Sequence, residues 1–312
     1  MSGYKILAGT TGIELGQKIS KTLNKELTIV NVSKFSDGEI FVKIEESMRG
    51  KHVFYIQSTS APANDNLIEL LLTLDALKRS SARTVTLIMP YFGYARQDRK
   101  SEPRVPISAK AVADMIESIG ITRLVTLDIH ADQIQGFFNS PVDNLYGANI
   151  FLKSLSGITN ENTIIASPDA GGVSRARYFA KKLGVNDIAV IDKRREKANE
   201  SEVMNVLGNV EGKEVIIIDD MVDTAGTLIK AAKAFKDQGA ISVKACITHG
   251  VLSGKALENL RHGKDDLDKL VISDSIKLKE DCDLIKVIDS SFLFAEVIRR
   301  INNNESITSL FK

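Results

Sequence analysis

Two adjacent carboxylates, Asp219 and Asp220, directly follow the apolar run Val215–Ile218. Four β-branched residues in a row are typical of a strand that is buried on both faces of a parallel sheet. A loop of small residues, Asp223–Thr227, comes next, and Leu228–Phe235 has helical spacing. Backbone N–H groups and the helix dipole converge on such a loop, so this stretch predicts an anion site. The two acids are placed for sugar hydroxyls, or for a metal that bridges to them.

The same residues could instead form a Rossmann-like turn whose acids only cap a helix, because short motifs also occur by chance. The complete pattern is more specific than its parts: four apolar residues are followed by D-D-x-x-D-T-A-G-T. This pattern resembles the phosphoribosyl-pyrophosphate loop of the type I phosphoribosyltransferase fold.

Aromatic and charged side chains follow two other predicted strands. Phe35 comes after the strand predicted at Leu27–Val32 and lies beside two carboxylates. The phenyl ring could stack on a purine, and the carboxylates could hydrogen-bond it. The alternative is a plain hairpin, since Asp37-Gly38 is a turn signal before a second strand-like run. The stretch PYFGYARQDRK follows the predicted strand Val85–Met89 and suggests a planar, anionic ligand, or else a solvated basic loop.

His130 ends the strand predicted at Leu124–Ile129. Asp128 is expected to point to the same face as His130, because side chains alternate along a strand. A purely structural histidine is the alternative. Lys193 and Arg195 follow the predicted strand Ile188–Ile191, within a charged stretch that runs to Glu202. This stretch is either a solvated helix or linker, or a mobile lid that carries two cations onto a phosphate group.

Strand, loop and helix recur in the same order in both halves of the chain. Thr163–Ala166, its loop and the helix at 173–183 echo residues 4–23, and the stretch 215–248 echoes residues 52–89. This duplication predicts an α/β fold of two similar doubly wound domains of phosphoribosyltransferase type, each around a mainly parallel sheet. The expected domains are 1–145 and 146–291, with Pro141–Tyr146 as the crossover and 292–312 packing back on the first.

Composition sets the outer limits on function. The 312 residues are 43% hydrophobic and 26% charged, as in an ordinary globular protein. A net charge of +1 argues against an electrostatic grip on nucleic acid or on an anionic membrane. Cys246 and Cys282 are too few for a disulfide framework. With no signal-peptide core and no apolar run of membrane-spanning length, a soluble, cytoplasmic protein is expected.

Six motifs together resemble the class I ribose-phosphate diphosphokinase family, the synthetases of phosphoribosyl pyrophosphate. They are FSDGEI, PYFGYARQDRK, DIHADQIQGFF with PVDNL, SPDAGG, DKRR and DDMVDTAGT. The resemblance runs essentially from end to end of the chain. An ordinary phosphoribosyltransferase would share DDMVDTAGT, but it is not expected to carry PYFGYARQDRK or DIHADQIQGFF.

The resemblance implies that the β,γ-diphosphate of ATP is moved to the C1 hydroxyl of ribose 5-phosphate, releasing AMP. It implies that Lys193 and Arg195 are catalytic and close over the transferring group. The implied ATP-binding residues are Phe35, Asp37, Gly38, Glu39, Arg96, Gln97, Asp98 and His130. The implied ribose 5-phosphate-binding residues are Arg195, Asp219, Asp220, Asp223, Thr224, Ala225, Gly226 and Thr227.

The resemblance also implies Mg²⁺ as cofactor, with His130 and Asp169 touching it directly or through water. Because Mg²⁺ prefers oxygen ligands, residue chemistry alone assigns His130 to a phosphate oxygen or a metal-bound water. A regulatory site for an activating phosphate or inhibiting ADP is implied at Ser47, Arg49, Arg83, Asp143, Ser306 and Thr308. Thr308 stands where the family often has serine, and the loop Ser101–Val105 also departs from the usual pattern, which leaves the strength of regulation open.

A homo-oligomer, a hexamer in this family, is the implied assembly, with the hairpin of Phe35, Asp37 and Glu39 reaching into a neighbouring subunit's nucleotide site. Neither nucleic acid nor membrane is expected as a partner. Two other classes of protein remain: a catalytically silent partner of the synthetase, and a regulator that only binds phosphoribosyl pyrophosphate. The intact cations, histidine and acids argue against the first, and the ATP-type motifs against the second.

Overall fold

The computed structural model describes residues 3–155, 162–194 and 203–311. The chain forms two compact units, each with its own hydrophobic core. Unit 1 consists of Met1–Tyr146, Ser275–Lys277 and Asp289–Lys312, and unit 2 consists of Gly147–Asp274 and Leu278–Ile288. The chain therefore leaves unit 1 after its first half and returns to it twice.

Unit 1 is built on a six-stranded sheet in which every neighbouring pair is parallel. In spatial order the strands are β2 (Leu27–Ile29), β1 (Tyr4–Ala8), β5 (His52–Ile56), β6 (Thr84–Met89), β7 (Arg123–Leu127) and β8 (Val142–Leu145). The chain passes from unit 1 to unit 2 directly after Tyr146, at the end of the predicted crossover Pro141–Tyr146. Residues 142–145 form the edge strand β8, because their backbone pairs with β7 before the chain leaves the unit.

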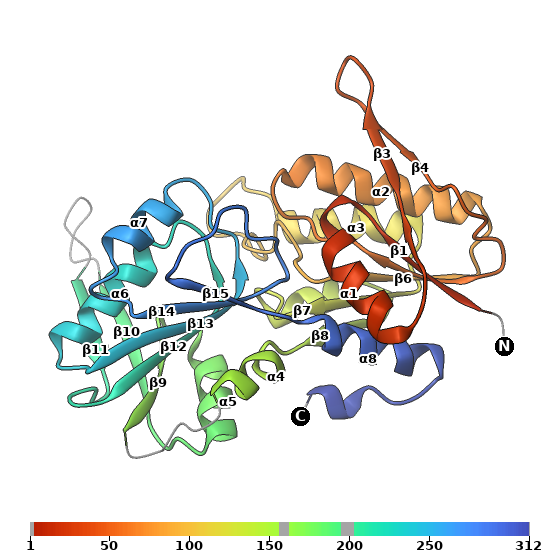
Figure 1. Ribbon diagram of the computed structural model, residues 1–312. Helices are drawn as coiled ribbons and strands as arrows, with labels where there is room; N and C mark the ends of the chain where they lie inside the picture. The colour runs from red at the N-terminus through yellow and green to blue at the C-terminus, as the bar shows by residue number, and fades with distance from the viewer. Residues whose placement is uncertain (1–2, 156–161, 195–202, 312) are drawn as a thin grey trace. The chain divides into compact units, whose positions relative to one another are not determined.

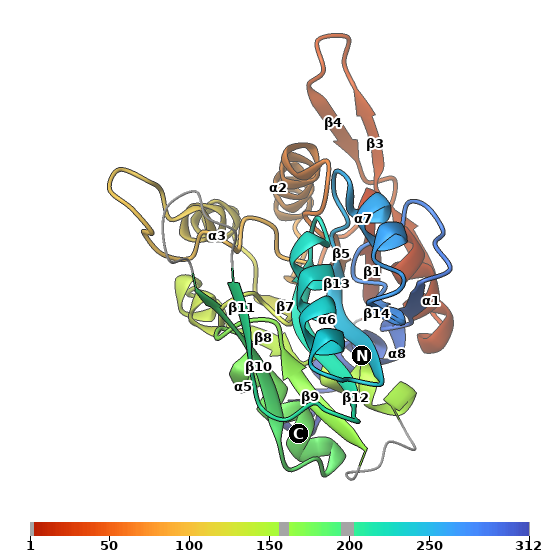
Figure 2. The same ribbon diagram turned by 90° about the vertical axis from the view of Figure 1, so that its left-hand side faces the viewer.

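Helices cover both faces of this sheet (Figures 1 and 2). α1 (Ile13–Leu23) packs against α8 (Ser291–Asn302) on one face, and α2 (Ala63–Arg79) packs against α3 (Ser108–Ile119) on the other. Leu70, Leu74 and Leu77 of α2 lie on its buried side, as the sequence pattern predicts. Short 3-10 turns complete the unit: Thr10–Gly12, Asp132–Phe137 and Thr308–Phe311.

A two-stranded antiparallel hairpin projects from unit 1 in both ribbon views (Figures 1 and 2). Its strands are β3 (Asn31–Lys34) and β4 (Ile40–Lys43). The single strand predicted at Leu27–Val32 is wrong: β2 ends at Ile29, and the chain then leaves the main sheet for the hairpin. Gly38 has a φ of +93°, and the Gly38 N–H donates to the Phe35 carbonyl at 3.0 Å, which confirms the predicted turn.

Unit 2 is built on a seven-stranded sheet in which only the β10–β11 pair is antiparallel. In spatial order the strands are β11 (Val203–Leu207), β10 (Ile188–Arg194), β9 (Thr163–Ser167), β12 (Glu214–Val222), β13 (Ser242–Gly250), β14 (Lys269–Ser273) and β15 (Ile285–Ile288). The helical segments are α4 (Ala148–Phe151), a 3-10 turn at Leu152–Leu155, α5 (Val173–Leu183), α6 (Gly226–Asp237) and α7 (Ala256–His262). α5 lies on one face of the sheet, while α6 and α7 lie together on the other (Figures 1 and 2).

The two sheets share one strand order, since β2-β1-β5-β6-β7-β8 corresponds to β10-β9-β12-β13-β14-β15. The predicted α/β fold of two similar doubly wound units is therefore confirmed. In each unit the connection after the first strand runs one way along the sheet, and the connection after the central strand runs the other way. Ligands of open α/β sheets bind at the carboxyl ends of the strands where this direction reverses. These places are β1 beside β5 in unit 1, and β9 beside β12 in unit 2.

Candidate active site

The acid pair, Asp219 and Asp220, lies at the reversal point of unit 2. β12 runs to Val222, whereas its pairing with β9 ends at Ile217 opposite Ala166. The acid pair therefore extends beyond the paired part of β9 while still pairing with β13. The Asp220 side chain is only 7% exposed and that of Asp219 is 23% exposed. Two carboxylates are thus largely removed from water at the carboxyl end of the sheet.

Arg175 of α5 provides a cation for this pair. Its Nη1 lies 3.4 Å from Asp219 Oδ1 and 3.2 Å from Asp220 Oδ1. The sequence analysis did not single out this residue. Its place in the first turn of the helix that follows β9, the neighbouring strand, was the available signal.

The electrostatics of the acid pair follow from its burial. Burial raises the pKa of Asp219 well above the ordinary value of a carboxyl, and the adjacent Asp220 raises this pKa further. Arg175 and the backbone N–H of Asp220, which donates to Asp219 Oδ1 at 2.9 Å, lower the pKa of Asp219. Two neighbouring carboxyl groups that are buried from water resist being ionised together, so the protonation state of this pair depends on the cations around it.

The small-residue loop, Asp223–Thr227, begins immediately after β12. Ala225 has a φ of +63° and is the N-cap residue of α6, which starts at Gly226. Residues from other segments hold the loop in place. Asn259 Nδ2 donates to the Thr224 carbonyl at 2.9 Å, and the Ser253 N–H donates to the Asp223 carbonyl at 3.2 Å. Among the described residues, no side chain caps α6. Its first N–H groups therefore face the loop as donors for an anion.

The loop after β9, residues 168–172, lies beside the acid pair. Asp169 Oδ1 accepts from the N–H groups of Gly171 at 2.9 Å and Gly172 at 3.2 Å. A Cβ on Gly172 would lie 2.5 Å from Ser167 Oγ and 3.9 Å from Asp219 Oδ1, so this glycine permits the close approach. Within the described parts of the chain, no three His, Cys, Asp or Glu side chains converge in a preformed metal cage.

The two predicted catalytic cations fall at the limit of the described residues. Lys193 belongs to β10, whose antiparallel pairing with β11 continues to Arg194. The beginning of the charged stretch is therefore a strand, not a helix or linker. Arg195 and the remainder of the stretch up to Glu202 lie outside the described residues.

The predicted nucleotide residues belong to unit 1. Phe35 is 57% exposed on the hairpin, and its ring meets that of Phe41 edge to face at 5.8 Å. The N–H of Glu39 donates to Asp37 Oδ1 at 3.1 Å, which orders the turn around Gly38. Arg96 and Gln97 are exposed. Asp98 accepts a hydrogen bond from Gln133, and Gln97 accepts one from Ser108, so other segments of the unit hold this loop.

His130 is exposed, whereas Asp128 is only 5% exposed. The prediction that they share a face is wrong, because β7 ends at Leu127 and Asp128 turns the chain with a φ of +38°. Alternation of side chains applies only to extended backbone. Asn144 of β8 holds the turn by accepting from the Ile129 N–H at 3.0 Å.

The predicted regulatory residues all belong to unit 1 and lie on several of its segments. Ser47, Arg49 and Arg83 are exposed. Asp143 pairs with Arg123 at 2.5 Å. Ser306 Oγ donates to Thr308 Oγ1 at 3.0 Å, and the Ser306 carbonyl accepts from Arg300 at 3.0 Å.

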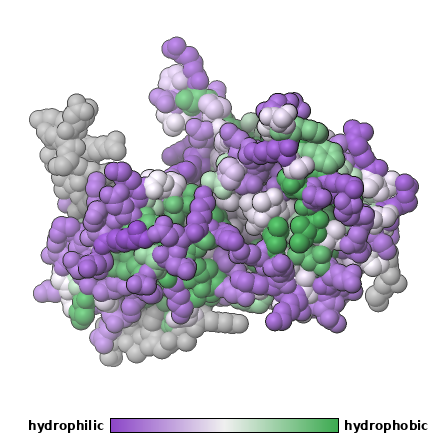
Figure 3. Space-filling model, turned by 45° about the horizontal axis from the view of Figure 1, so that its top comes forward, coloured by the Kyte–Doolittle hydropathy of each residue, from purple (hydrophilic) through white to green (hydrophobic). Residues whose placement is uncertain are grey.

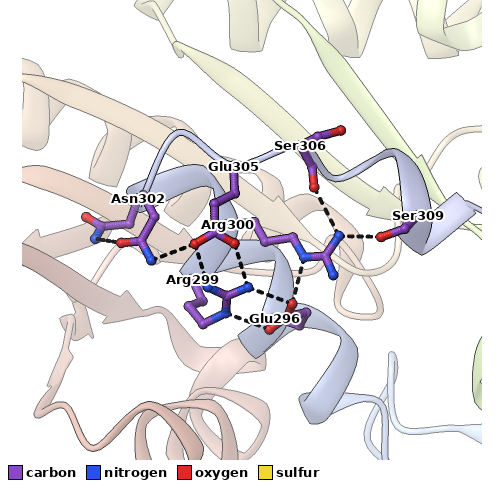
Figure 4. A network of polar contacts seen from close by, with 8 residues as sticks. Glu296, Arg299, Arg300, Asn302, Glu305, Ser306 and Ser309 are labelled. Atoms are coloured by element: carbon purple, nitrogen blue, oxygen red, sulfur yellow. Dashed lines mark hydrogen bonds and ion pairs between the residues drawn. The ribbon is translucent and has the colours of Figure 1, made fainter.

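Figure 4 shows how the Glu296–Arg299–Arg300 network holds this C-terminal segment against α8. A cavity of about 460 Å³ in unit 1 lies beside the segment. Its lining includes His52, Thr84 and Arg123, which begin β5, β6 and β7, so it lies at the amino edge of the sheet.

The face drawn in Figure 3 is mainly hydrophilic, with hydrophobic residues in small patches. Of the helices in the described residues, none is long and apolar enough to cross a membrane.

Repetition of one doubly wound unit, with an acid pair and a small-residue loop at the second reversal point, defines a protein of the phosphoribosyltransferase fold class. Residues 4–120 match the family described as the N-terminal domain of ribose phosphate pyrophosphokinase, and residues 194–312 match the phosphoribosyl synthetase-associated domain. The chain belongs to the ribose-phosphate pyrophosphokinase family.

Individual relatives agree over the full length. The ribose-phosphate pyrophosphokinase of Campylobacter jejuni is 58% identical over 311 residues, covering 100% of both chains. That of Wolinella succinogenes is 55% identical over 311 residues with the same coverage. The crystal structure of phosphoribosylpyrophosphate synthetase from Mycobacterium smegmatis superposes with a TM-score of 0.91 at 36% identity, covering 97% of this chain and 100% of that chain.

Proposed function

We propose that the chain transfers the diphosphoryl group of ATP to the C1 hydroxyl of ribose 5-phosphate, forming 5-phosphoribosyl 1-diphosphate and AMP for nucleotide biosynthesis. The observation that carries this proposal is the acid pair followed by the small-residue loop and the uncapped start of α6 at the reversal point of unit 2. Full-length similarity to ribose-phosphate pyrophosphokinases supports it.

The site of unit 2 suits ribose 5-phosphate. The N–H groups of Asp223–Thr227 and the start of α6 bind the 5-phosphate, because backbone donors and the helix dipole favour an anion there. Asp219 and Asp220 accept hydrogen bonds from the ribose hydroxyls. A carboxylate that accepts a neutral hydroxyl forms a stronger hydrogen bond than a neutral acceptor does.

In the transfer, the C1 hydroxyl oxygen bonds to the β-phosphorus while the bond from that phosphorus to the oxygen bridging the α-phosphate breaks. The hydroxyl proton is released to water, and AMP departs with the bridging oxygen. No covalent enzyme intermediate is needed. The protein contributes positioning and charge neutralisation, for which Lys193 and Arg195 are the proposed residues.

ATP is proposed to bind residues of unit 1. The exposed Phe35 ring stacks on adenine, with Asp37, Gly38 and Glu39 at the edge of the base. Arg96, Gln97, Asp98 and His130 lie along the nucleotide, where a cation and hydrogen-bond donors suit the phosphates.

Mg²⁺ is the proposed cofactor, and Asp169 and His130 are its proposed contacts. The lack of a three-residue cage within the described segments fits this ion, which keeps several waters and uses few carboxylates together with substrate phosphates. When bound, Mg²⁺ supplies neutralisation of phosphate charge.

The chain is proposed to act as a homo-oligomer, a hexamer in the implied assembly, with shared nucleotide sites. A hairpin that projects from its unit with two exposed aromatics, Phe35 and Phe41, is suited to reach a second subunit. Mixing the inactive variants Phe35→Ala/Asp37→Ala and Lys193→Ala tests this. Shared sites predict partial return of activity, whereas subunit exchange without any return would show that each chain builds its own site.

Phosphate activation and ADP inhibition through Ser47, Arg49, Arg83, Asp143, Ser306 and Thr308 are likewise proposed. A cytoplasmic location is proposed with them, since Cys246 and Cys282 are both free thiols, as expected in a reducing compartment.

The direct test measures AMP and phosphoribosyl pyrophosphate formed by purified protein from Mg²⁺, ATP and ribose 5-phosphate. Lys193→Ala is expected to lower kcat on the order of a hundredfold while both substrates still bind. Lys181→Ala, an exposed lysine on α5, is the matched control and should behave as wild type. An unchanged kcat in Lys193→Ala would remove Lys193 from the mechanism.

A further inference from the structure

The contact between Arg175 and the acid pair joins three elements of unit 2. Arg175 lies in the first turn of α5, and α5 packs against both β9 and β12. The Arg175 side chain is 20% exposed, so it is largely enclosed by these elements. One nitrogen, Nη1, approaches a carboxylate oxygen of each acid, at 3.4 and 3.2 Å. The guanidinium therefore bridges the pair instead of serving one member of it.

The acid pair needs such a cation more than an exposed pair would. Asp219 and Asp220 are adjacent in the chain, and Asp220 is almost fully buried. Burial and the neighbouring charge both favour the protonated form of Asp219, and Arg175 opposes them. A protonated carboxyl would lose much of its capacity to accept hydrogen bonds from a sugar.

The loop after β9 determines the position of Arg175. Gly172 is the residue before α5 and packs against Ser167, near Asp219 Oδ1. This close approach sets the start of α5 beside the end of β12. The position of Arg175 is thus a consequence of the same β9–β12 pairing that exposes the acid pair to a ligand.

We propose that Arg175 is a positioning residue for ribose 5-phosphate: its guanidinium bridges the Asp219 and Asp220 side chains and holds them oriented to accept the ribose hydroxyls. This inference rests on the proposed function of the site. Because Arg175 acts through the acid pair, its loss should weaken the binding of ribose 5-phosphate and leave the binding of ATP largely unchanged.

The experiment compares Arg175→Met with wild type by steady-state kinetics and by calorimetric titration of ribose 5-phosphate in the presence of Mg²⁺ and a non-hydrolysable ATP analogue. Methionine removes the charge and keeps an unbranched side chain. The KM and the Kd for ribose 5-phosphate are expected to rise about tenfold or more, with the KM for ATP changed by less than about twofold. Arg177→Met is the matched control, because Arg177 is exposed on the same helix.

Two further variants keep the test decisive. If Arg175→Met does not fold, Arg175→Gln is measured instead, since its amide still donates to the acids without a charge. Arg175→Lys restores a cation and should recover part of the affinity for ribose 5-phosphate. A folded variant without the charge that keeps the wild-type KM and Kd for ribose 5-phosphate would overturn the inference, and so would an equal rise in the KM for ATP. If wild type itself forms no phosphoribosyl pyrophosphate, the proposed function fails instead.

Discussion

The reversal points of the two units have the same strand order but carry different side chains. In unit 1, Gln57 and Ser58 occupy the places that Asp219 and Asp220 occupy in unit 2, since Gln57 and Asp219 each lie five residues after the first residue of their strand. The loop after β1 is held by its own unit: Thr10 N–H donates to Glu69 at 2.7 Å and Thr11 N–H donates to Gln57 at 3.1 Å. In unit 2 the acid pair instead contacts a cation, the guanidinium of Arg175.

This difference shows that the fold sets the location of a possible binding site, whereas the side chains there determine its function. In unit 1, the glutamine and a buried glutamate satisfy the loop from within, and a Cβ on Gly9 would lie 2.5 Å from Glu69 Oε1. Ser58 Oγ also donates to the Ser275 carbonyl at 3.1 Å, which adds a further segment over the edge. The edge in unit 1 therefore serves stability, and the edge in unit 2 is available to a substrate.

The largest expected effect is on the acid pair itself. Asp220→Asn should lower kcat/KM for ribose 5-phosphate about a hundredfold, roughly 2.7 kcal/mol, because a charged acceptor for the sugar is lost. The KM for ribose 5-phosphate should rise more than the KM for ATP. A collapse of ATP affinity with normal binding of ribose 5-phosphate would show that the two sites are assigned the wrong way round.

The two N-cap glycines sharpen the comparison next. Gly12 and Gly172 precede α1 and α5 with similar dihedral angles, but a Cβ would meet the Ile56 carbonyl oxygen at 2.1 Å in unit 1 and Ser167 Oγ at 2.5 Å in unit 2. Backbone cannot move aside as a serine hydroxyl can. Gly12→Ala should therefore cost about 2 kcal/mol of unfolding free energy, and Gly172→Ala about 1 kcal/mol. Urea unfolding of both variants gives the comparison, and equal losses would contradict it.

Glu69→Gln tests whether the edge of unit 1 is only structural. Glu69 is 3% exposed, and burial is the main cause that raises its pKa above 4.5. Above pH 4.5 the unfolded chain loses this proton before the folded protein does, so wild-type stability should fall as pH rises through this range. The variant should lack this slope, gain on the order of 1 kcal/mol at neutral pH, and keep its activity. Chemical unfolding at several pH values measures the slope, and a large loss of kcat would give Glu69 a role in catalysis.

The smallest effect is expected at the C-terminal network, which gives the opposite pH dependence. Hydrogen bonds from Arg299 and Arg300 lower the pKa of Glu296 to about 2. The stabilisation is therefore present above the unfolded pKa of about 4.5 and is lost as pH falls towards 2. Because the Glu296 side chain is 33% exposed, Glu296→Gln should cost less than about 1 kcal/mol at pH 7. A Tm series from pH 7 to pH 3 checks this, and a larger loss at pH 3 than at pH 7 would contradict it.

Much of the fold could be predicted from local sequence, and the failures have identifiable causes. Apolar runs such as Val215–Ile218 and Val85–Met89 are strands because a parallel sheet covered on both faces buries every residue of them. The strand predicted at Leu27–Val32 failed because β propensity does not say which sheet a residue joins. The prediction for Asp128 and His130 failed because the chain turns immediately after Leu127.

The sequence by itself determined the strand–loop–helix units, the small-residue loop at 223–227, the hairpin turn at Gly38 and the adjacency of Asp219 and Asp220. Each of these depends on neighbours within a few residues, where backbone preference and side-chain type act directly. The tertiary structure alone decided that Arg175 meets the acid pair and that residues 142–145 join the sheet of unit 1. Those contacts join distant residues, and they depend on strand order and burial of whole faces, which no short stretch of sequence specifies.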